Sequence, residues 1–361
     1  MVDSFQFTGT PHIIFGAGKI NKLPGLIANY GKNVLLIEGS GSFFESEKGK
    51  EINNLLSRSD LNISTASVVQ EPYPTLIDDI VKDQNKSKVD VVIAIGGGSV
   101  LDTGKAVSAM LPKQEPVKDY LEGIGSKKPS GDKVPYIAIP TTSGTGSEAT
   151  SNAVISEIGP EGFKKSLRHK NYIPDIALVD PELVLSCPPD ITAASGMDAF
   201  TQLLEAYVSD KASVMTDALA WEGLKAVHRS LEKVVKEGNN LKARNDMAFA
   251  ALMSGIVLAN AGLGLVHGFA SAIGGRLGMP HGKVCGSLMA VANEKTIQAL
   301  QMNDPQNPAL KKYVKVGVLF SGEKEQDKAN DYYLGQLIRR MNEMTDFFRL
   351  ERFGQYGMTA A

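Results

Sequence analysis

The stretch that decides the fold is VDVVIAIGGGSVLDTGKA, which runs from Val89 to Ala106. Its first half is an unbroken apolar run, typical of a strand buried on both faces of a parallel sheet. Three glycines, Gly96 to Gly98, follow at once and lead into a helical pattern. Glycines at such a turn let the backbone approach a phosphate group, and the free amides of the helix's first turn attract negative charge. The stretch therefore predicts a phosphate-binding turn, or a tight turn of the same shape without a ligand.

The start of this helix carries its own signal. Ser99 is placed to cap the helix, and Asp102 stands three residues later, where a capping box would have its second member. The spacing of the three glycines matches neither the dinucleotide fingerprint GxGxxG nor a P-loop. The prediction of a phosphate-binding turn thus rests on the strand–turn–helix arrangement, and not on a known phosphate-binding sequence motif.

Other apolar runs surround this unit and extend the sheet. The strands that we predict are His12–Phe15, Asn33–Glu38, Val89–Ile95, Val134–Ile139 and Ile176–Asp180. Helical patterns such as Ser99–Met110 separate them, so the first half is predicted to be an α/β domain with an open, mostly parallel, Rossmann-like sheet. Two further loops at predicted strand ends carry polar groups. Pro140–Glu148 is rich in hydroxyls, which donate hydrogen bonds to phosphate and ribose oxygens, and Glu38-Gly39 ends the strand where such sheets contact a ribose.

The second half of the chain is predicted to be helical. Strand signals are sparse after Pro189, and helical periodicity marks Gly196–Ser209, Ala212–Lys236, Lys242–Ala261 and Leu310–Arg349. Prolines at 181, 188 and 189 interrupt the pattern between the halves. We therefore predict a nucleotide-binding α/β domain over residues 1–184 and an all-α domain for metal and substrate over residues 185–361.

The composition narrows the class of protein. A chain of 361 residues exceeds what one core usually serves, and a net charge of −2 argues against binding to nucleic acid or an anionic membrane surface. The two cysteines, Cys187 and Cys285, are too few for a disulfide framework and are expected to be packing residues. Ser254–Gly275 lacks charged residues, but its glycines, Asn260 and His267 favour a buried helix over a membrane span. We expect a soluble, cytoplasmic protein.

Four polar residues of the helical half form a possible metal site. Asp198 and Gln202 are four residues apart, so they share one face of a helix. His267 is predicted to lie in the middle of a helix, and His281 opens the next one. A carboxylate, an amide and two imidazoles could hold a divalent metal. The same pattern also fits histidines that are merely hydrogen-bonded in a core.

Together, these motifs resemble the iron-containing (group III) alcohol dehydrogenase family. The resemblance covers nearly the whole chain and rests on FGAG at Phe15–Gly18, GGGSVLDTGKA at Gly96–Ala106, PTTSGTGSE at Pro140–Glu148, LVDPEL at Leu178–Leu183, GMDAFTQ at Gly196–Gln202, VHGFA at Val266–Ala270 and PHG at Pro280–Gly282. It implies a dehydroquinate synthase-like architecture with the active site in the cleft between two domains. The cofactor-binding residues that it implies are Gly39, Ser40, Gly97, Gly98, Ser99, Asp102, Thr141, Thr142, Ser147 and Leu178. It implies catalytic and metal-binding roles for Asp198, His267 and His281, with Gln202 in the place of the fourth ligand.

Three positions depart from the family pattern. Gln202 stands where the family usually has a histidine ligand, and an amide oxygen is a weaker ligand for soft divalent metals. Ser271 replaces a histidine that many members carry near the nicotinamide, so a proton relay would need another route. Gly39 stands where members that prefer NAD often have an aspartate, which favours NADP.

The function that we predict is metal-dependent, NAD(P)-linked alcohol dehydrogenase or aldehyde reductase activity (EC 1.1.1.-), with Fe or Zn and either NADP or NAD. Small alcohols and aldehydes are the expected partners, the chain is expected to form a homodimer, and neither nucleic acid nor membrane is expected to bind. The alternatives are a metal-free reductase similar to maleylacetate reductase, a lyase similar to dehydroquinate synthase, and a nucleotide-binding protein without chemistry. Thr359 is placed like the N-cap of a further helix, so we expect that a final C-terminal helix is missing from this sequence.

Overall fold

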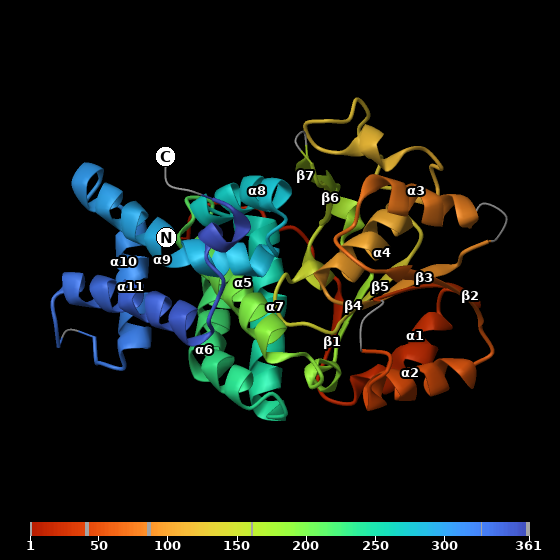
Figure 1. Cartoon of the computed structure of the whole chain (residues 1–361), viewed down its shortest axis with the longest axis horizontal. Helices are drawn as coiled ribbons and strands as arrows, with labels where there is room; N and C mark the ends of the chain where they lie inside the picture. The colour runs from red at the N-terminus through yellow and green to blue at the C-terminus, as the bar shows by residue number, and fades with distance from the viewer. Residues whose placement is uncertain (1, 40–42, 85–87, 160–161, 326, 359–361) are drawn as a thin grey trace. The chain divides into compact units, whose positions relative to one another are not determined.

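A computed structural model of the chain describes residues 2–39, 43–84, 88–159, 162–325 and 327–358. Contacts between Cα atoms divide the chain into two units. The first is Thr8–Cys187, and the second consists of the residues from Pro188 onward together with those before Thr8. The two units differ in secondary structure, since the long strands all lie in the first and the second is helical (Figure 1).

The first unit is built on one six-stranded sheet in which every neighbouring pair of strands is parallel. In spatial order its strands are β1 (His12–Phe15), β8 (Ile176–Val179), β5 (Tyr136–Pro140), β4 (Val91–Gly96), β2 (Asn33–Gly39) and β3 (Asn62–Val68). All residues of the two central strands β4 and β5 are buried. Their uniform apolar character follows from this burial, because helices cover both faces of the sheet.

Two pairs of helices cover the sheet. On one face lie α1 (Leu23–Ile27) and α2 (Glu47–Ser57), and on the other lie α3 (Pro74–Asp83) and α4 (Gly98–Met110). An apolar cluster fills the space on each side. The predicted α/β fold with a mostly parallel open sheet is thereby confirmed.

The five predicted strands correspond to five of the six strands of the sheet. The prediction lacked β3, an edge strand whose apolar run is interrupted by serines and a threonine with exposed or partly exposed side chains. It also lacked an antiparallel hairpin of β6 (Asn152–Glu157) and β7 (Phe163–Arg168). The prediction that Ser99 caps α4 was wrong. The helix begins at Gly98 with Gly97 as its N-cap, so Ser99 already lies in the first turn.

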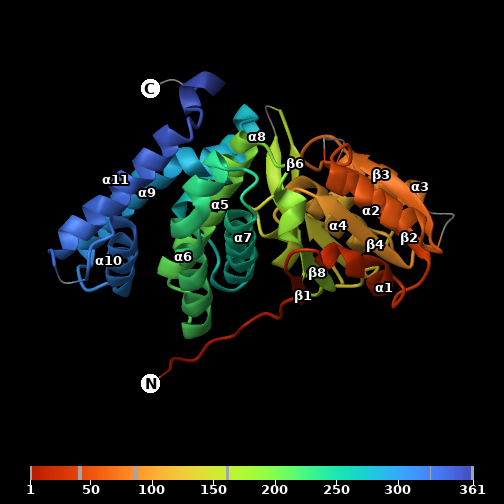
Figure 2. The same cartoon turned by 90° about the horizontal axis from the view of Figure 1, so that it is seen from below.

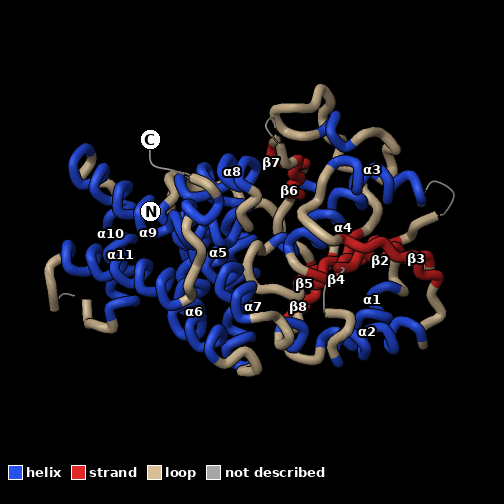
Figure 3. Tube along the Cα trace, in the orientation of Figure 1, coloured by secondary structure: helices blue, strands red, loops and turns tan. Residues whose placement is uncertain are grey.

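The second unit consists of seven longer helices within the described residues. They are α5 (Pro189–Val208), α6 (Val214–Lys236), α7 (Leu241–Ala261), α8 (Leu265–Leu277), α9 (His281–Asn303), α10 (Pro308–Ser321) and α11 (Asn330–Phe347). Figure 2 shows α5, α6 and α7 side by side, and the contacts between them agree. Figure 3 shows helices and connecting loops, with no strand, across the described part of this unit.

Two helix predictions need correction. The periodic stretch Leu310–Arg349 is two helices, because Gly322 adopts a left-handed conformation (φ 73°) that ends α10. His267 is the third residue of α8 and not a mid-helix residue, since the helix begins only at Leu265. His281 opens α9, as predicted.

No single helix among the described residues is long and apolar enough to cross a membrane, although α7 and the first part of α8 pass that test as a pair bent by 101°.

A buried lysine ties α4 to the loop that follows β5. Lys105 is 2% exposed, and its Nζ donates hydrogen bonds of 2.8 Å to the carbonyl oxygens of Ser147 and Asn152 and to Oγ1 of Thr150. Burial lowers the pKa of Lys105 to about 8, and the charge of Asp102 opposes this effect. The ammonium group thus holds the loop at one end of the sheet.

We expect Lys105→Met to lower the free energy of unfolding by about 3–5 kcal/mol, because it leaves several buried acceptors and Asp102 without their cation. Lys118→Met is a control, since the ion pair of Lys118 with Glu157 is half exposed and should contribute less than about 1 kcal/mol. Urea unfolding followed by circular dichroism measures both. An equal loss in the two variants would contradict the anchoring role of Lys105.

Candidate functional site

One buried face of α5 carries the polar residues of a candidate metal centre. Asp198, Gln202 and Glu205 lie at positions i, i+4 and i+7, so they line the same side of the helix. All three are buried. A carboxylate in such surroundings is costly unless other groups pair with it, so the neighbours of each residue decide what this face can do.

Helix α8 meets this face at its first turn. The Nδ1 atom of His267 lies 2.6 Å from Oε2 of Glu205, while its Nε2 lies 3.2 Å from Oδ1 of Asp198. The other oxygen of Glu205 accepts the backbone N–H of Val266 at 2.6 Å. This amide belongs to the first turn of α8, where helix geometry leaves the N–H groups without partners. Glu205 therefore caps the helix and orients the imidazole at the same time.

Helix α9 supplies two more groups one turn apart. Nε2 of His281 lies 3.6 Å from Oδ1 of Asp198, and Cys285 follows four residues later on the same face. Gly282 lets this helix approach α5 closely, because a Cβ atom there would lie 2.4 Å from the carbonyl oxygen of Ala194. The glycine of the PHG motif thus has a packing role that brings His281 to Asp198.

Four potential ligand atoms converge at this point. One atom each from Asp198, His267, His281 and Cys285 lies within 4.8 Å of all the others. The structure therefore brings together the three metal ligands that the resemblance implied, and adds a thiol. Carboxylate, imidazole and thiolate groups are the usual ligands of Zn²⁺, and the first two also hold iron.

Gln202 sits beside this cluster with its amide engaged by two neighbours. Its Nε2 donates to Oδ2 of Asp198 at 3.3 Å, and its Oε1 accepts from the hydroxyl of Ser254 at 2.8 Å. The oxygen of Asp198 that faces the imidazoles is the other one, Oδ1. In this arrangement Gln202 orients the carboxylate.

The electrostatics of the centre follow from burial and close pairing. Burial alone would lower the pKa of His267, but Cys285 and the carboxylates of Asp198 and Glu205 raise it well above its usual value. Burial would raise the pKa of Asp198, and the two histidines more than offset this and lower it. Burial raises the pKa of Cys285 to about 12. Without a metal, the centre therefore retains protons that a metal must displace.

The first unit carries the predicted cofactor loops at adjacent strand ends. Gly96, at the end of β4, pairs with Pro140, at the end of β5. The loops that follow pack tightly, since a Cβ atom on Gly98 would lie 2.6 Å from the side chain of Thr145 and one on Gly97 would lie 3.3 Å from Thr142. Because the N-cap of α4 is a glycine, no cap side chain covers the first amides of the helix. Free amides at the start of a helix are suited to bind an anion such as a pyrophosphate.

Some hydroxyl groups around these loops are hydrogen-bonded within the protein, and others are left to bond a ligand. Ser147 donates to Asp102 at 2.5 Å, and Asp102 also accepts the N–H of Val154 at 3.0 Å. This predicted cofactor pair is thus bonded internally. The Oγ atom of Ser143 is buried and has no hydrogen-bond partner among the described residues. Such an orphaned hydroxyl fits a donor kept for a ligand, so the loops are consistent with a nucleotide.

The remaining predicted cofactor residues differ in their surroundings. Gly39 ends β2 next to β4, partly exposed, while Ser40 lies outside the described residues. Leu178 is fully buried in the apolar cluster beside β8, so its side chain has a core role. Ser99 is partly exposed in the first turn of α4. In the helical unit, Ser271 donates to the carbonyl oxygen of His267 at 3.1 Å.

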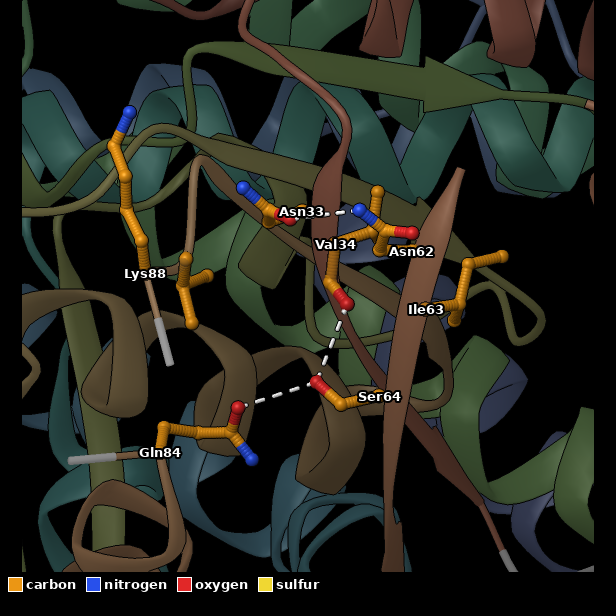
Figure 4. Close-up of a pocket in the computed structure, with 8 residues that line it drawn as sticks. Asn33, Val34, Asn62, Ile63, Ser64, Gln84 and Lys88 are labelled. Atoms are coloured by element: carbon orange, nitrogen blue, oxygen red, sulfur yellow. Dashed lines mark hydrogen bonds between the residues drawn. The ribbon is translucent and has the colours of Figure 1, made fainter. Parts of the chain in front are cut away.

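A pocket of about 450 Å³ lies away from these groups, at the amino-terminal ends of β2 and β3. Figure 4 shows four of its polar side chains bonded in two pairs: Asn62 donates to Asn33 at 3.0 Å, and the Ser64 hydroxyl donates to Gln84 at 3.2 Å. Ligands of open parallel sheets bind at the opposite, carboxyl ends of the strands. We therefore give this pocket no role in catalysis.

A parallel sheet with glycine loops at its strand ends suits a nucleotide, and the carboxylate–imidazole centre of the helical unit suits a divalent metal. Comparison with known families makes this specific. Residues 10–181 match the model of iron-containing alcohol dehydrogenase, and residues 192–353 match the C-terminal model of the Fe-containing alcohol dehydrogenase family. The chain belongs to the iron-containing alcohol dehydrogenase family, whose members use a nicotinamide cofactor and a divalent metal, and it is a metal-dependent alcohol dehydrogenase.

Individual relatives agree with this assignment. Alcohol dehydrogenase 4 of Saccharomyces cerevisiae is 32% identical over 338 residues, which cover 92% of this chain and 84% of the relative. The NAD-dependent methanol dehydrogenase of Bacillus methanolicus is 33% identical over 280 residues, or 77% of this chain and 72% of the relative. Among solved structures, the alcohol dehydrogenase from Oenococcus oeni matches with a TM-score of 0.86 and 27% identity, covering 99% of this chain and 90% of that one.

Sequence reasoning overlooked three residues that the structure places at the sites. Glu205 follows Asp198 by seven residues and Cys285 follows His281 by four, so helical spacing alone could have placed each on the face of its neighbour. Ser143 lies inside the hydroxyl-rich motif Pro140–Glu148, which the sequence did reveal. That its hydroxyl is buried without a hydrogen-bond partner is visible only in the folded loop.

We expect Glu205→Gln to weaken Zn²⁺ binding by about 10- to 100-fold, because a carboxylate behind a ligating imidazole holds the ring in place and increases its basicity. Competition with a chromophoric chelator measures the affinity of the full chain. Glu222→Gln serves as control, since Glu222 is exposed on α6 and forms an ion pair with the neighbouring Lys225. Unchanged affinity in Glu205→Gln would refute this positioning role.

Proposed function

We propose that the chain interconverts small alcohols and the corresponding aldehydes or ketones, with Asp198, His267 and His281 as its metal-binding catalytic residues. The observation that carries this proposal is the convergence of these three side chains from α5, α8 and α9 on one buried point. We further propose that residues 1–184 form the nucleotide-binding domain, that residues 185–361 form the metal and substrate domain, and that the protein acts as a homodimer.

In the proposed reaction the alcohol would be oxidised to the carbonyl compound: a bound nicotinamide would supply the hydride acceptor, and the hydroxyl proton would leave to solvent. A bound divalent ion supplies Lewis acidity that favours the alkoxide form of the alcohol. Asp198 provides a fixed negative charge at the site, and Gln202 holds its distal oxygen. Glu205 keeps a proton on Nδ1 of His267, so that Nε2 is the nitrogen that faces the site. The glycine loops after β4 and β5 hold the pyrophosphate.

Asp198→Asn and His267→Ala should each reduce kcat for alcohol oxidation by at least about 1,000-fold, since the stabilisation of the alkoxide is lost with the metal. Binding of NADPH, followed by its fluorescence, should remain within about threefold of the original protein. The control is Asp190→Asn at the exposed start of α5. Full activity of metal-stripped His267→Ala protein would rule out the metal mechanism and favour the metal-free reductase.

The preferred cofactor that we propose is NADP. Gly39 ends β2 beside the glycine loop of β4, and a glycine there leaves room for a 2′-phosphate where an acidic side chain would bond the ribose hydroxyl. The methanol dehydrogenase among the relatives is named for NAD, so the family includes members that use the other cofactor.

We expect kcat/KM to be higher with NADP⁺ than with NAD⁺, and we expect Gly39→Asp to shift this ratio towards NAD⁺ by about tenfold or more. The reason is repulsion between the new carboxylate and the 2′-phosphate. A tenfold change in the ratio corresponds to about 1.4 kcal/mol. Initial rates with a series of primary alcohols and both cofactors, in the presence of Zn²⁺ or Fe²⁺, provide the measurement. A ratio unaffected by Gly39→Asp would show that this strand end does not select the cofactor.

A further inference from the structure

The thiol of Cys285 faces the metal centre and not only the surrounding core. Cys285 is fully buried one turn after His281. Its Sγ lies 3.6 Å from Nε2 of His281 and 3.7 Å from Nε2 of His267. A buried cysteine is commonly a small packing residue, but such a thiol is surrounded by apolar atoms. Here the sulfur meets the same two nitrogens that face Asp198.

We propose that Cys285 is the fourth protein ligand of the metal, in the role that sequence analysis gave to Gln202. This inference rests on the proposed metal site and assigns its donor set as one carboxylate, two imidazoles and one thiolate. The thiol gives its proton to solvent when the sulfur–metal bond forms, as is general for cysteine ligands.

Four distances between the ligand atoms agree with the edges of a tetrahedron. With Zn–N and Zn–O bonds of about 2.1 Å and a Zn–S bond of about 2.3 Å, tetrahedral geometry requires N···S edges of about 3.6 Å and O···N edges of about 3.4 Å. The N···S distances to Cys285 are 3.6 and 3.7 Å, and the O···N distances from Asp198 to His267 and His281 are 3.2 and 3.6 Å. These four distances suit one small ion that is bound by all four atoms.

Gln202 lies outside this tetrahedron. Its side chain bonds Oδ2 of Asp198, whereas the two imidazoles face Oδ1. The amide oxygen of Gln202 is 2.8 Å from the hydroxyl of Ser254 on α7. These contacts make Gln202 a positioning residue for Asp198.

The type of ligand also decides which metal the site prefers. A sulfur ligand also makes the site softer, so the centre should select Zn²⁺ over Fe²⁺. Substrate would bind by expanding the coordination of the metal from four to five.

Cobalt substitution tests the assignment in the full-length chain. Co²⁺ bound through a thiolate gives an intense sulfur-to-metal charge-transfer band in the near ultraviolet, and oxygen and nitrogen ligands do not. We expect this band in the unaltered protein at one equivalent of Co²⁺ and in Cys187→Ser, because Cys187 belongs to the other unit. Binding of Co²⁺ without the band would overturn the role of Cys285 and leave the metal site intact. No binding at all would contradict the metal site itself, and the assignment with it.

Zinc affinities of matched variants separate the two candidate ligands. Cys285→Ser and Cys285→Ala should weaken Zn²⁺ binding by at least about 100-fold, more than the usual effect of a residue behind the ligands, and should lose the cobalt band. Gln202→Ala should weaken Zn²⁺ binding only about tenfold and keep the band. The reverse order of effects would assign the fourth position to Gln202. If the Cys285 variants do not fold, the spectra of the unaltered protein and of Gln202→Ala still decide the question.

Discussion

The helical unit depends on one buried chain of hydrogen bonds, from Glu205 through His267 to Asp198. Ionisable groups are costly inside a protein unless each has a partner, so these three residues require one another. The chain also joins α5 to α8, since Glu205 accepts the backbone N–H of Val266 in the first turn of α8. The positions of two helices therefore follow from the need to satisfy one carboxylate. The same arrangement leaves an imidazole nitrogen facing the site where a metal can bind.

The two functional sites use different physical means. The cofactor loops of the first unit depend on backbone geometry, because Gly97 and Gly98 permit close contact with the neighbouring loop and leave helix amides open to an anion. The metal centre depends on side chains that arrive from three helices. In each unit a buried polar contact holds the parts in place, through Lys105 in one and Glu205 in the other. Both contacts connect elements that are distant in sequence.

The centre differs from the usual family pattern in a way that its surroundings explain. With Gln202 at the position of a histidine, the amide bonds the carboxylate of Asp198 and the hydroxyl of Ser254. The thiol of Cys285 lies at a distance from both imidazoles that suits a ligand. The loss of a histidine ligand at position 202 on α5 is thus compensated by the thiol of Cys285 on α9. Membership of the family alone would not have indicated this arrangement.

The sequence by itself determined the α/β sheet without its edge strand, the glycine turn after β4 and the start of α9, because apolar periodicity and glycine content are local properties. The order of its motifs also pointed to Asp198, His267 and His281 as candidate ligands. The sequence did not indicate the edge strand β3, the break at Gly322 or the orphaned hydroxyl of Ser143, whose causes lie in exposure, backbone conformation and surrounding atoms. Only the tertiary structure placed Cys285 beside His267 and turned Gln202 towards the far oxygen of Asp198. The physical reason is that ligand geometry depends on how closely α5, α8 and α9 pack, and helical spacing determines a face of each helix but not its distance from the next.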